Sequence, residues 1–479
     1  MGLFAPRRAE PGVIMGCLPD GTILRHRDGR PLLAVGPTGC GKTSTVLVPT
    51  LFEYDQSAIV WDLKGMLAQT TGAARERLGS DVIVLDICRP GGVCYNPLMG
   101  IRKGPYLVPD AQKAARLMLD DENAGIWRNA AVGYLTAVFI HVLLSAPDAD
   151  KTLLGVSKHI ARGDDGTREM LQSPHPTVRR AAQRITDKNF DALVKPPDKA
   201  KGFAERTMGG GSGGSMSMRQ SVYFTAGARF EDFEFEILAE KTSRSDFTMS
   251  DLCCRDRPVT LYVIARPNDA ENYMRVFRLI VVQLMEHLLE EVHVMPDGKA
   301  KRWKVLFAID EFLNFNILEM SRWLTFVREY GVLPVFLAQS AEDVHLMYGP
   351  KLTANLPTMQ FTPMSGREAK ILETNLGEAI EQLPTTTVSK KGFMEPPTIS
   401  RGLKTERRAL ESAAALMELE PHEIRITGHG PPIRALGLRP WEIPQWKALY
   451  GPPTREWTPN PDASPWLGSA AKPLPPLIV

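Results

Sequence analysis

A glycine-rich turn near the start of the chain constrains the fold more than any other feature. Residues 36–43 are Gly-Pro-Thr-Gly-Cys-Gly-Lys-Thr, a full match to the phosphate-binding loop pattern G-x-x-x-x-G-K-[ST]. The apolar residues 32–35 before it are typical of a strand, and residues 44–48 after it can begin a helix. Because backbone N–H groups of such a turn point inward at a helix N-terminus, the motif predicts a strand–loop–helix unit that binds phosphate.

Each residue of this loop is a candidate ligand of a nucleotide. Lys42 would reach the β- and γ-phosphates, and the hydroxyl of Thr43 would hold Mg²⁺. The predicted nucleotide-binding set is Gly36, Pro37, Thr38, Gly39, Cys40, Gly41, Lys42, Thr43 and Ser44.

Two acids far downstream supply the second part of the predicted site. Residues 305–309 form an apolar run that predicts a buried strand, and Asp310 and Glu311 follow it directly. Asp310 can accept a water on the Mg²⁺ and so complete the metal shell that Thr43 begins. Glu311 can polarise the water that attacks the γ-phosphate. A strand that merely ends in two charged residues is the alternative, and the presence of the loop weighs against it.

A third apolar run, residues 331–338, predicts a strand that ends at Gln339. In a parallel sheet this amide would lie near the γ-phosphate and could sense it. Arg328 precedes the strand and has three possible roles. It could pair with Glu329, reach a phosphate on a neighbouring subunit, or be a solvated surface residue.

Charge and cysteine content exclude little but indicate a compartment. The 479 residues carry 57 basic and 55 acidic side chains, a net charge of +2 that neither requires nor excludes nucleic acid. The six cysteines, at 17, 40, 88, 94, 253 and 254, lack metal-binding spacing and suit a reducing cytoplasm. No signal peptide is evident. The longest apolar run, residues 130–144, is shorter than the roughly 20 residues of a membrane span and predicts a buried helix.

The order of predicted elements divides the chain into four parts. Residues 1–104 and 251–440 alternate strands with helices and predict the two halves of an α/β nucleotide-binding domain. Within them, the apolar runs at 57–62, 81–86 and 259–264 predict strands buried on both faces. Helical patterns dominate residues 105–250, which predict an inserted all-α domain. The Gly-Ser block at 209–215 is either a natural loop or an engineered replacement. Residues 441–479, rich in Pro and Trp, predict an extended or disordered arm.

Several motifs, in this order, resemble the TraG-like coupling ATPases of conjugation and type IV secretion. The resemblance covers roughly residues 20–440. Besides the loop at 36–43, it is carried by Asp62-Leu63-Lys64-Gly65, Asn96-Pro97-Leu98, Trp127-Arg128-Asn129-Ala130, Ile309-Asp310-Glu311-Phe312, Arg328-Glu329-Tyr330-Gly331 and Ala338-Gln339-Ser340.

The resemblance implies a RecA-like P-loop ATPase with a mostly parallel central sheet and an inserted all-α domain. It implies a homo-hexamer that uses ATP and Mg²⁺ at the cytoplasmic mouth of a type IV secretion channel, at the inner face of the bacterial inner membrane. Its cargo would be a relaxase-bound DNA strand or protein effectors, with contact to single-stranded DNA. By position, Lys42, Glu311, Gln339 and Arg328 would be catalytic, and Thr43 and Asp310 would hold the metal, with Arg328 reaching the neighbouring subunit's nucleotide.

The sequence departs from this family in one respect and leaves two other functions open. Most family members begin with transmembrane helices, and we expect no direct membrane anchor in this chain. A DNA pump of the FtsK or HerA class shares the motor, although the helical insertion favours the coupling function. An ATP-switched module that recruits cargo without translocation is the third possibility.

Overall fold

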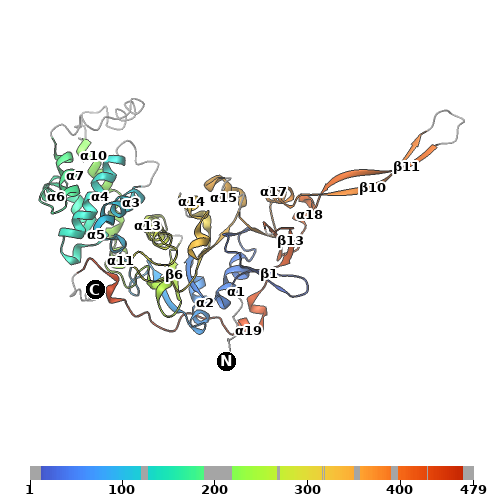
Figure 1. Cartoon of the computed structure of the whole chain (residues 1–479), viewed down its shortest axis with the longest axis horizontal. Coiled ribbons are helices and arrows are strands. Elements are labelled where there is room, and N and C mark those ends of the chain that lie inside the picture. The colour runs from blue at the N-terminus through green and yellow to red at the C-terminus, as the bar shows by residue number, and fades with distance from the viewer. Residues whose placement is uncertain are drawn as a thin grey trace. The chain divides into compact units, whose positions relative to one another are not determined.

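The computed structural model describes residues 12–119, 128–187, 218–266, 270–314, 317, 319–349, 356–389, 398–428 and 430–467. The chain divides into two compact units, each made of segments distant in sequence (Figure 1). Unit 1 comprises residues 1–54, 307–328 and 333–449, and unit 2 comprises residues 55–306, 329–332 and 450–479. The Gly-Ser block at 209–215 and Trp127 lie outside the described residues.

Unit 1 is built on a mixed sheet with strand order β2-β1-β13-β12-β9-β3-β8-β7. Strand β3 pairs in parallel with β8 and β9, and the strands from β9 outward to β2 pair antiparallel. β3, β7 and β8 are buried along their whole length, as their continuous apolar runs predicted. The bounds are β1 Val13–Cys17, β2 Ile23–His26, β3 Leu32–Val35, β7 Val305–Ile309, β8 Val332–Ala338, β9 Thr358–Phe361, β12 Glu423–Thr427 and β13 Ile433–Leu436.

The helix after the glycine-rich loop starts with a turn of π-helix, Thr43–Leu47, and continues as α1, Val48–Glu53. Pro49 has no N–H to donate to the carbonyl of Thr45, which removes an ordinary α-helical bond at this point. The other helices of unit 1 are α14 Met320–Trp323, α15 Ala341–Tyr348, α17 Gly366–Leu376, α18 Ala413–Met417 and α19 Pro444–Lys447. Serine side chains cap α15 and α17 and thereby fix where each helix begins.

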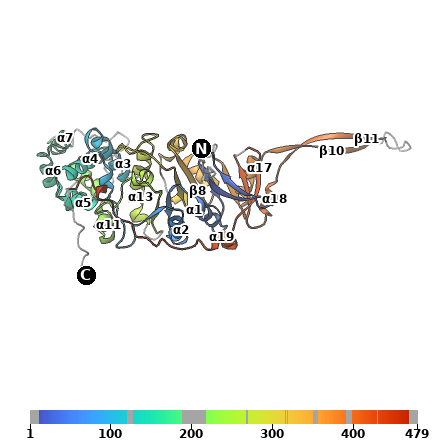
Figure 2. The same cartoon turned by 60° about the horizontal axis from the view of Figure 1, so that its bottom comes forward.

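A two-stranded ribbon, β10 Glu378–Ser389 and β11 Thr398–Ala409, extends from unit 1 (Figures 1 and 2). The strands pair antiparallel over their whole length, from Glu378 opposite Ala409 to Ser389 opposite Thr398. No pattern in the sequence predicted this element. The ribbon residues whose burial is described are exposed or partly exposed, and the sequence lacks the alternation of apolar and polar residues that predicts a strand.

Unit 2 contains a parallel sheet of β4 Ser57–Asp62, β6 Val259–Ile264 and β5 Asp81–Asp86, in that spatial order. All three strands occupy the residues that the sequence predicted. Helix α2, Met66–Arg77, follows β4, and the carboxylate of Asp62 accepts the backbone N–H groups of Met66 and Ala68. Asp62 therefore caps the helix, which gives the Asp-Leu-Lys-Gly motif a structural role. Helix α13, Ala270–Leu288, follows β6.

The described chain between β5 and β6 contains helices and no strand. Figure 1 shows α3, α4, α5, α6, α7 and α10 gathered in one bundle, in which α4 packs against α3, α5, α7 and α10. The bounds are α3 Leu107–Met118, α4 Arg128–Ser145, α5 Leu153–Ala161, α6 Asp164–Met170, α7 Pro176–Thr186, α10 Met218–Gly227, α11 Glu236–Lys241 and α12 Asp251–Cys254.

Helix α4 contains the longest apolar run of the sequence. Among the described residues it is the one helix long and apolar enough to cross a membrane, with 18 residues and a mean hydropathy of 1.2. Two-thirds of it, 67%, is buried inside unit 2. The prediction of a buried helix is therefore confirmed.

The C-terminal segment is anchored to the rest of the chain by its tryptophans. In unit 1 the buried Trp446 donates from Nε1 to Glu53 Oε1 at 2.9 Å. In unit 2 Trp457 Nε1 donates to the carbonyl of Asp246, and Trp466 Nε1 to that of Ile101. Residues 441–467 are thus held by specific hydrogen bonds and include the short helix α19, Pro444–Lys447; residues 468–479 lie outside the described part.

Replacing Trp446 by alanine should destabilise unit 1. The side chain is 2% exposed and its indole is hydrogen-bonded, so we expect a loss of about 3–5 kcal/mol of unfolding free energy. Urea denaturation followed by circular dichroism measures the loss. Trp441→Ala is the matched control, because that tryptophan is 48% exposed and should cost little. Equal midpoints for the two variants would contradict the anchoring role.

Candidate nucleotide-binding site

The loop between β3 and the π-turn forms an open backbone cradle at one edge of the unit 1 sheet. The Gly36 N–H donates to the carbonyl of Ala338 at 3.2 Å, which ties the start of the loop to β8. Gly39 and Gly41 have φ of +83° and +91°, the left-handed region that favours glycine. At Gly36 a Cβ would lie 2.7 Å from Phe361 Cβ, so close packing requires glycine there.

This cradle fits a phosphate group. Within the described part of the chain, no backbone carbonyl accepts the N–H of Gly39 or Gly41. A Cβ added at Gly39 would meet nothing within 4 Å, so the space over the loop is open. Two N–H donors beside open space at the start of a helix are what a phosphate oxygen requires.

Lys42 lies over the inner side of the loop. Its side chain is buried, and Nζ donates to the carbonyls of Gly36 at 2.5 Å and Pro37 at 3.0 Å. These bonds hold the ammonium group beside the loop. Burial raises the pKa of the neighbouring Cys40 thiol, so Cys40 stays uncharged and contributes packing rather than charge.

Thr43 and Asp310 meet although 267 positions separate them in sequence. Thr43 Oγ1 donates to Asp310 Oδ1 at 3.0 Å. Mg²⁺ binds oxygen ligands at about 2.1 Å in an octahedron, whose adjacent corners lie about 3 Å apart. The two oxygens therefore already have the spacing of neighbouring positions around this metal, and both are of the chemical type that it prefers.

Glu311 and Gln339 form a second pair beside the first. Gln339 Nε2 donates to Glu311 Oε2 at 3.0 Å, and so fixes the direction of the carboxylate. Glu311 has a φ of +59°, a conformation that costs a non-glycine residue roughly 1–2 kcal/mol. Such strain persists where the surroundings impose it and is concentrated at functional sites. The turn at the end of β7 thus points Asp310 at the loop helix and Glu311 at Gln339.

Arg328 lies near the amino ends of β3 and β8, at the opposite end of these strands from the loop. It precedes β8, and a Cβ at Gly29, before β3, would lie 3.0 Å from Arg328 Cγ. The length of β8, seven residues, separates Arg328 from Gln339, which corresponds to about 20 Å. The structure therefore brings together Lys42, Thr43, Asp310, Glu311 and Gln339, and it places Arg328 out of reach of the loop in its own chain.

A cavity of about 290 Å³ adjoins the loop on the side of Gly36 and Pro37. Two of its lining residues carry buried atoms that find no hydrogen-bond partner in the described part of the chain, Nε2 of Gln360 and Oε2 of Glu368. A donor and an acceptor are thus available to a polar ligand group or to water. No sequence motif on β9 or α17 indicated these two residues. Ser340 and Ser365, which cap α15 and α17, are the sequence signal that two helices begin beside this cavity.

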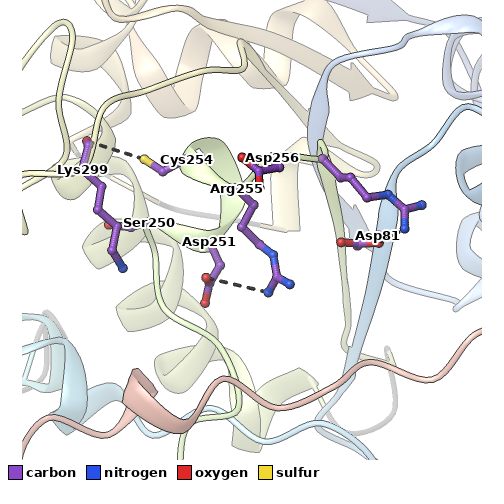
Figure 3. Close-up of a pocket in the computed structure, with 8 residues that line it drawn as sticks. Asp81, Ser250, Asp251, Cys254, Arg255, Asp256 and Lys299 are labelled. Carbon is purple, nitrogen blue, oxygen red and sulfur yellow. Dashed lines mark hydrogen bonds and ion pairs between the residues drawn. The ribbon is translucent and has the colours of Figure 1, made fainter.

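A second cavity of about 440 Å³ lies in unit 2 (Figure 3). Its charges largely neutralise one another: Arg255 lies 3.9 Å from Asp251, and Arg257 lies 3.1 Å from Asp81. Cys254 donates from Sγ to the carbonyl of Lys299. This cavity shares no residue with the loop site, so we assign nucleotide binding to unit 1.

The chain belongs to the family of type IV secretory system conjugative DNA transfer proteins. The family model matches residues 8–435. Its fold class is accordingly that of α/β P-loop ATPases with a RecA-like, mostly parallel central sheet.

Individual relatives agree with this assignment. The conjugal transfer protein TraG of Escherichia coli is 28% identical over 334 residues, which cover 67% of this chain and 50% of TraG. VirD4 of Rhizobium radiobacter is 26% identical, covering 69% of this chain and 44% of VirD4. The chain thus spans about half the length of these curated relatives.

Solved structures of the plasmid coupling protein TrwB share the fold. TrwB in complex with a non-hydrolysable ATP analogue has a TM-score of 0.60 at 14% identity, covering 95% of this chain and 92% of that one. TrwB with ADP and Mg²⁺ has a TM-score of 0.53 at 15% identity, covering 90% of each chain.

The backbone strain at Glu311 can be tested by comparing the stabilities of its alanine and glycine variants, because at positive φ glycine should be the more stable of the two. Glu311→Gly should be more stable than Glu311→Ala by about 1 kcal/mol, because glycine has no Cβ to clash at positive φ. Urea denaturation midpoints measure the difference. At Glu342, within α15, the same pair should show alanine as the more stable variant. Alanine ahead of glycine at both positions would mean that Glu311 is not held in the left-handed region.

Proposed function

We propose that this chain is an ATP-driven coupling protein that recruits relaxase-bound DNA or effector proteins and feeds them to a type IV secretion channel. The observation that carries the proposal is the convergence of the Thr43–Asp310 and Glu311–Gln339 pairs on the phosphate-binding loop. Family membership supplies the biological setting. The complexes of TrwB with an ATP analogue and with ADP and Mg²⁺ support ATP and Mg²⁺ as the ligands.

The residues of the site divide the reaction among them. Lys42 would neutralise charge on the β- and γ-phosphates, while Thr43 and Asp310 would hold Mg²⁺. The bound metal supplies positive charge to the oxygens that become more negative as the terminal phosphate leaves. Glu311, directed by Gln339, would accept a proton from the water that attacks the γ-phosphorus as the bond to the β-phosphate oxygen breaks.

The position of Arg328 suggests that ATP hydrolysis requires the subunits to assemble. Its position beside Gly29, before the start of β3, supports a role toward a nucleotide of another subunit rather than one on its own loop. In a ring of identical subunits that end of the strands would face the neighbouring nucleotide, where an arginine contributes about 10³-fold or more to the rate. We therefore propose a homo-hexamer with composite sites, located at the cytoplasmic face of the inner membrane beside the channel. The helical bundle between β5 and β6 would contact cargo.

ATP hydrolysis by the purified chain, with and without single-stranded DNA across a protein concentration series, tests this proposal. Turnover that rises steeply with protein concentration and is stimulated by DNA is expected for an assembling DNA motor. Hydrolysis that is flat with concentration and indifferent to DNA would favour the recruitment switch and overturn the motor.

Glu311→Gln should bind ATP normally and lose most of its turnover. The substitution keeps the size of the side chain and its contact with Gln339 but removes the proton acceptor, which is typically worth about 10²–10⁴-fold in rate. Nucleotide binding by fluorescence titration and phosphate release measure the two properties. Glu418→Gln, on the exposed surface of unit 1, is the control. Normal turnover in Glu311→Gln would remove Glu311 from the mechanism.

Arg328→Ala should lose turnover by about 10³-fold while each subunit still binds ATP. Mixing it with an inactive Lys42→Ala variant should restore activity, because some interfaces then combine an intact loop with an intact arginine. Phosphate release from the mixture measures the recovery. Arg322→Ala, another exposed arginine six positions away, should behave as the unaltered chain. A mixture as inactive as its components would contradict an arginine supplied in trans.

A further inference from the structure

Two histidines and a glutamate meet inside the helical bundle of unit 2. His141 lies on α4, His159 on α5 and Glu169 on α6, three consecutive helices that Figure 1 shows side by side. One ring nitrogen of each histidine and one carboxylate oxygen all lie within 4.8 Å of one another. The imidazole rings are 4.9 Å apart between centroids.

The two imidazoles are buried without enough hydrogen-bond partners. His141 is 4% exposed and His159 is 7% exposed. Among the residues that the structure describes, Nδ1 of His141 and Nε2 of His159 have no hydrogen-bond partner. His141 Nε2 lies 3.5 Å from Glu169 Oε1, which is beyond the distance of a good hydrogen bond. Buried polar atoms in native proteins normally have partners, and here one nitrogen of each buried ring lacks one.

The donor set is that of a first-row divalent metal ion. Imidazole nitrogen and carboxylate oxygen together suit Zn²⁺ and its neighbours, whereas Mg²⁺ and Ca²⁺ prefer oxygen alone. Burial lowers the pKa of both histidines, that of His159 to about 4, so their nitrogens are uncharged at neutral pH. Ligands of a tetrahedral Zn²⁺ lie about 3.4 Å apart, so the three residues need to draw together by about 1 Å.

Arg162 occupies the outer side of the cluster. Its guanidinium donates to Glu169 Oε2 at 2.7 Å and leaves Oε1 facing His141. This hydrogen bond to Arg162 fixes the direction of the carboxylate. Metal ligands are commonly oriented in this way by an outer hydrogen-bond partner. The side chain of Glu169 is 48% exposed, so the fourth position around a metal could be filled by solvent.

We propose that His141, His159 and Glu169 form a Zn²⁺-class metal site in the helical bundle. The ion would join α4, α5 and α6 through one nitrogen of each ring and one carboxylate oxygen. The site shares no residue with the phosphate-binding loop, so the proposal stands independently of nucleotide hydrolysis.

Zinc retention by the full chain tests the site. The chain is first treated with a chelator, then equilibrated with Zn²⁺ by dialysis, and bound zinc is measured by atomic absorption. The unaltered chain should hold one zinc more than Glu169→Gln and His159→Gln, with affinity at this site reduced at least tenfold in each variant. Glu169→Gln is the primary variant because its half-exposed side chain can change without disturbing the core. Circular dichroism shows that each variant is folded.

Asp165→Asn is the matched control, since it removes the same charge from the same helix and only affects an exposed pair with Arg168. Its zinc content should equal that of the unaltered chain. Equal zinc in all four proteins, or none in any, would overturn the proposal. Co²⁺ substitution gives a separate test: bands of nitrogen and oxygen ligation support the cluster. Intense thiolate charge-transfer bands would assign the metal to cysteines instead and overturn it.

Discussion

The parallel pairing of β3 with β8 is the constraint on which the candidate site depends. The register from Leu32 opposite Val335 to Val35 opposite Ala338 places the next residues, Gly36 and Gln339, at the same edge of the sheet. The Thr43–Asp310 hydrogen bond then ties the loop helix to the end of β7. Each strand is buried throughout, so a shift of register would expose apolar side chains and displace the site together.

Buried strands and their polar ends are the parts of this protein that its sequence predicts well. The apolar runs of β4, β5, β6 and β7 gave the observed strands, because such runs have few alternatives when both faces are covered. The ribbon β10–β11 and the outer strands β1, β2, β12 and β13 were not predicted. They are short or exposed, and β13 and β12 also pair with the distant strands β1 and β9, which no local pattern reveals.

The candidate site could be assembled from sequence as residue types, but its geometry could not. The loop pattern and the Asp-Glu pair predicted which side chains matter. Nothing in the sequence indicated that Glu311 adopts a positive φ or that Gln339 donates to it. These features arise from the turn that ends β7, and they determine which of two adjacent acids faces the metal ligand and which faces the amide. Local strain of this kind is imposed by tertiary structure, so sequence propensity gives no sign of it.

The helical bundle shows the same limit for polar groups in a core. The apolar character of residues 130–144 correctly predicted a buried helix. It gave no sign that His141, within this run, contacts the imidazole of His159. A single buried histidine in an apolar run has no meaning until its neighbours are known, because the energetic cost depends on whether its nitrogens are partnered. The same reasoning applies to Arg328, whose motif gave its identity but whose place near the amino ends of β3 and β8 came only from the fold. In both cases the chemistry of a residue is decided by a contact that its own chain segment does not contain.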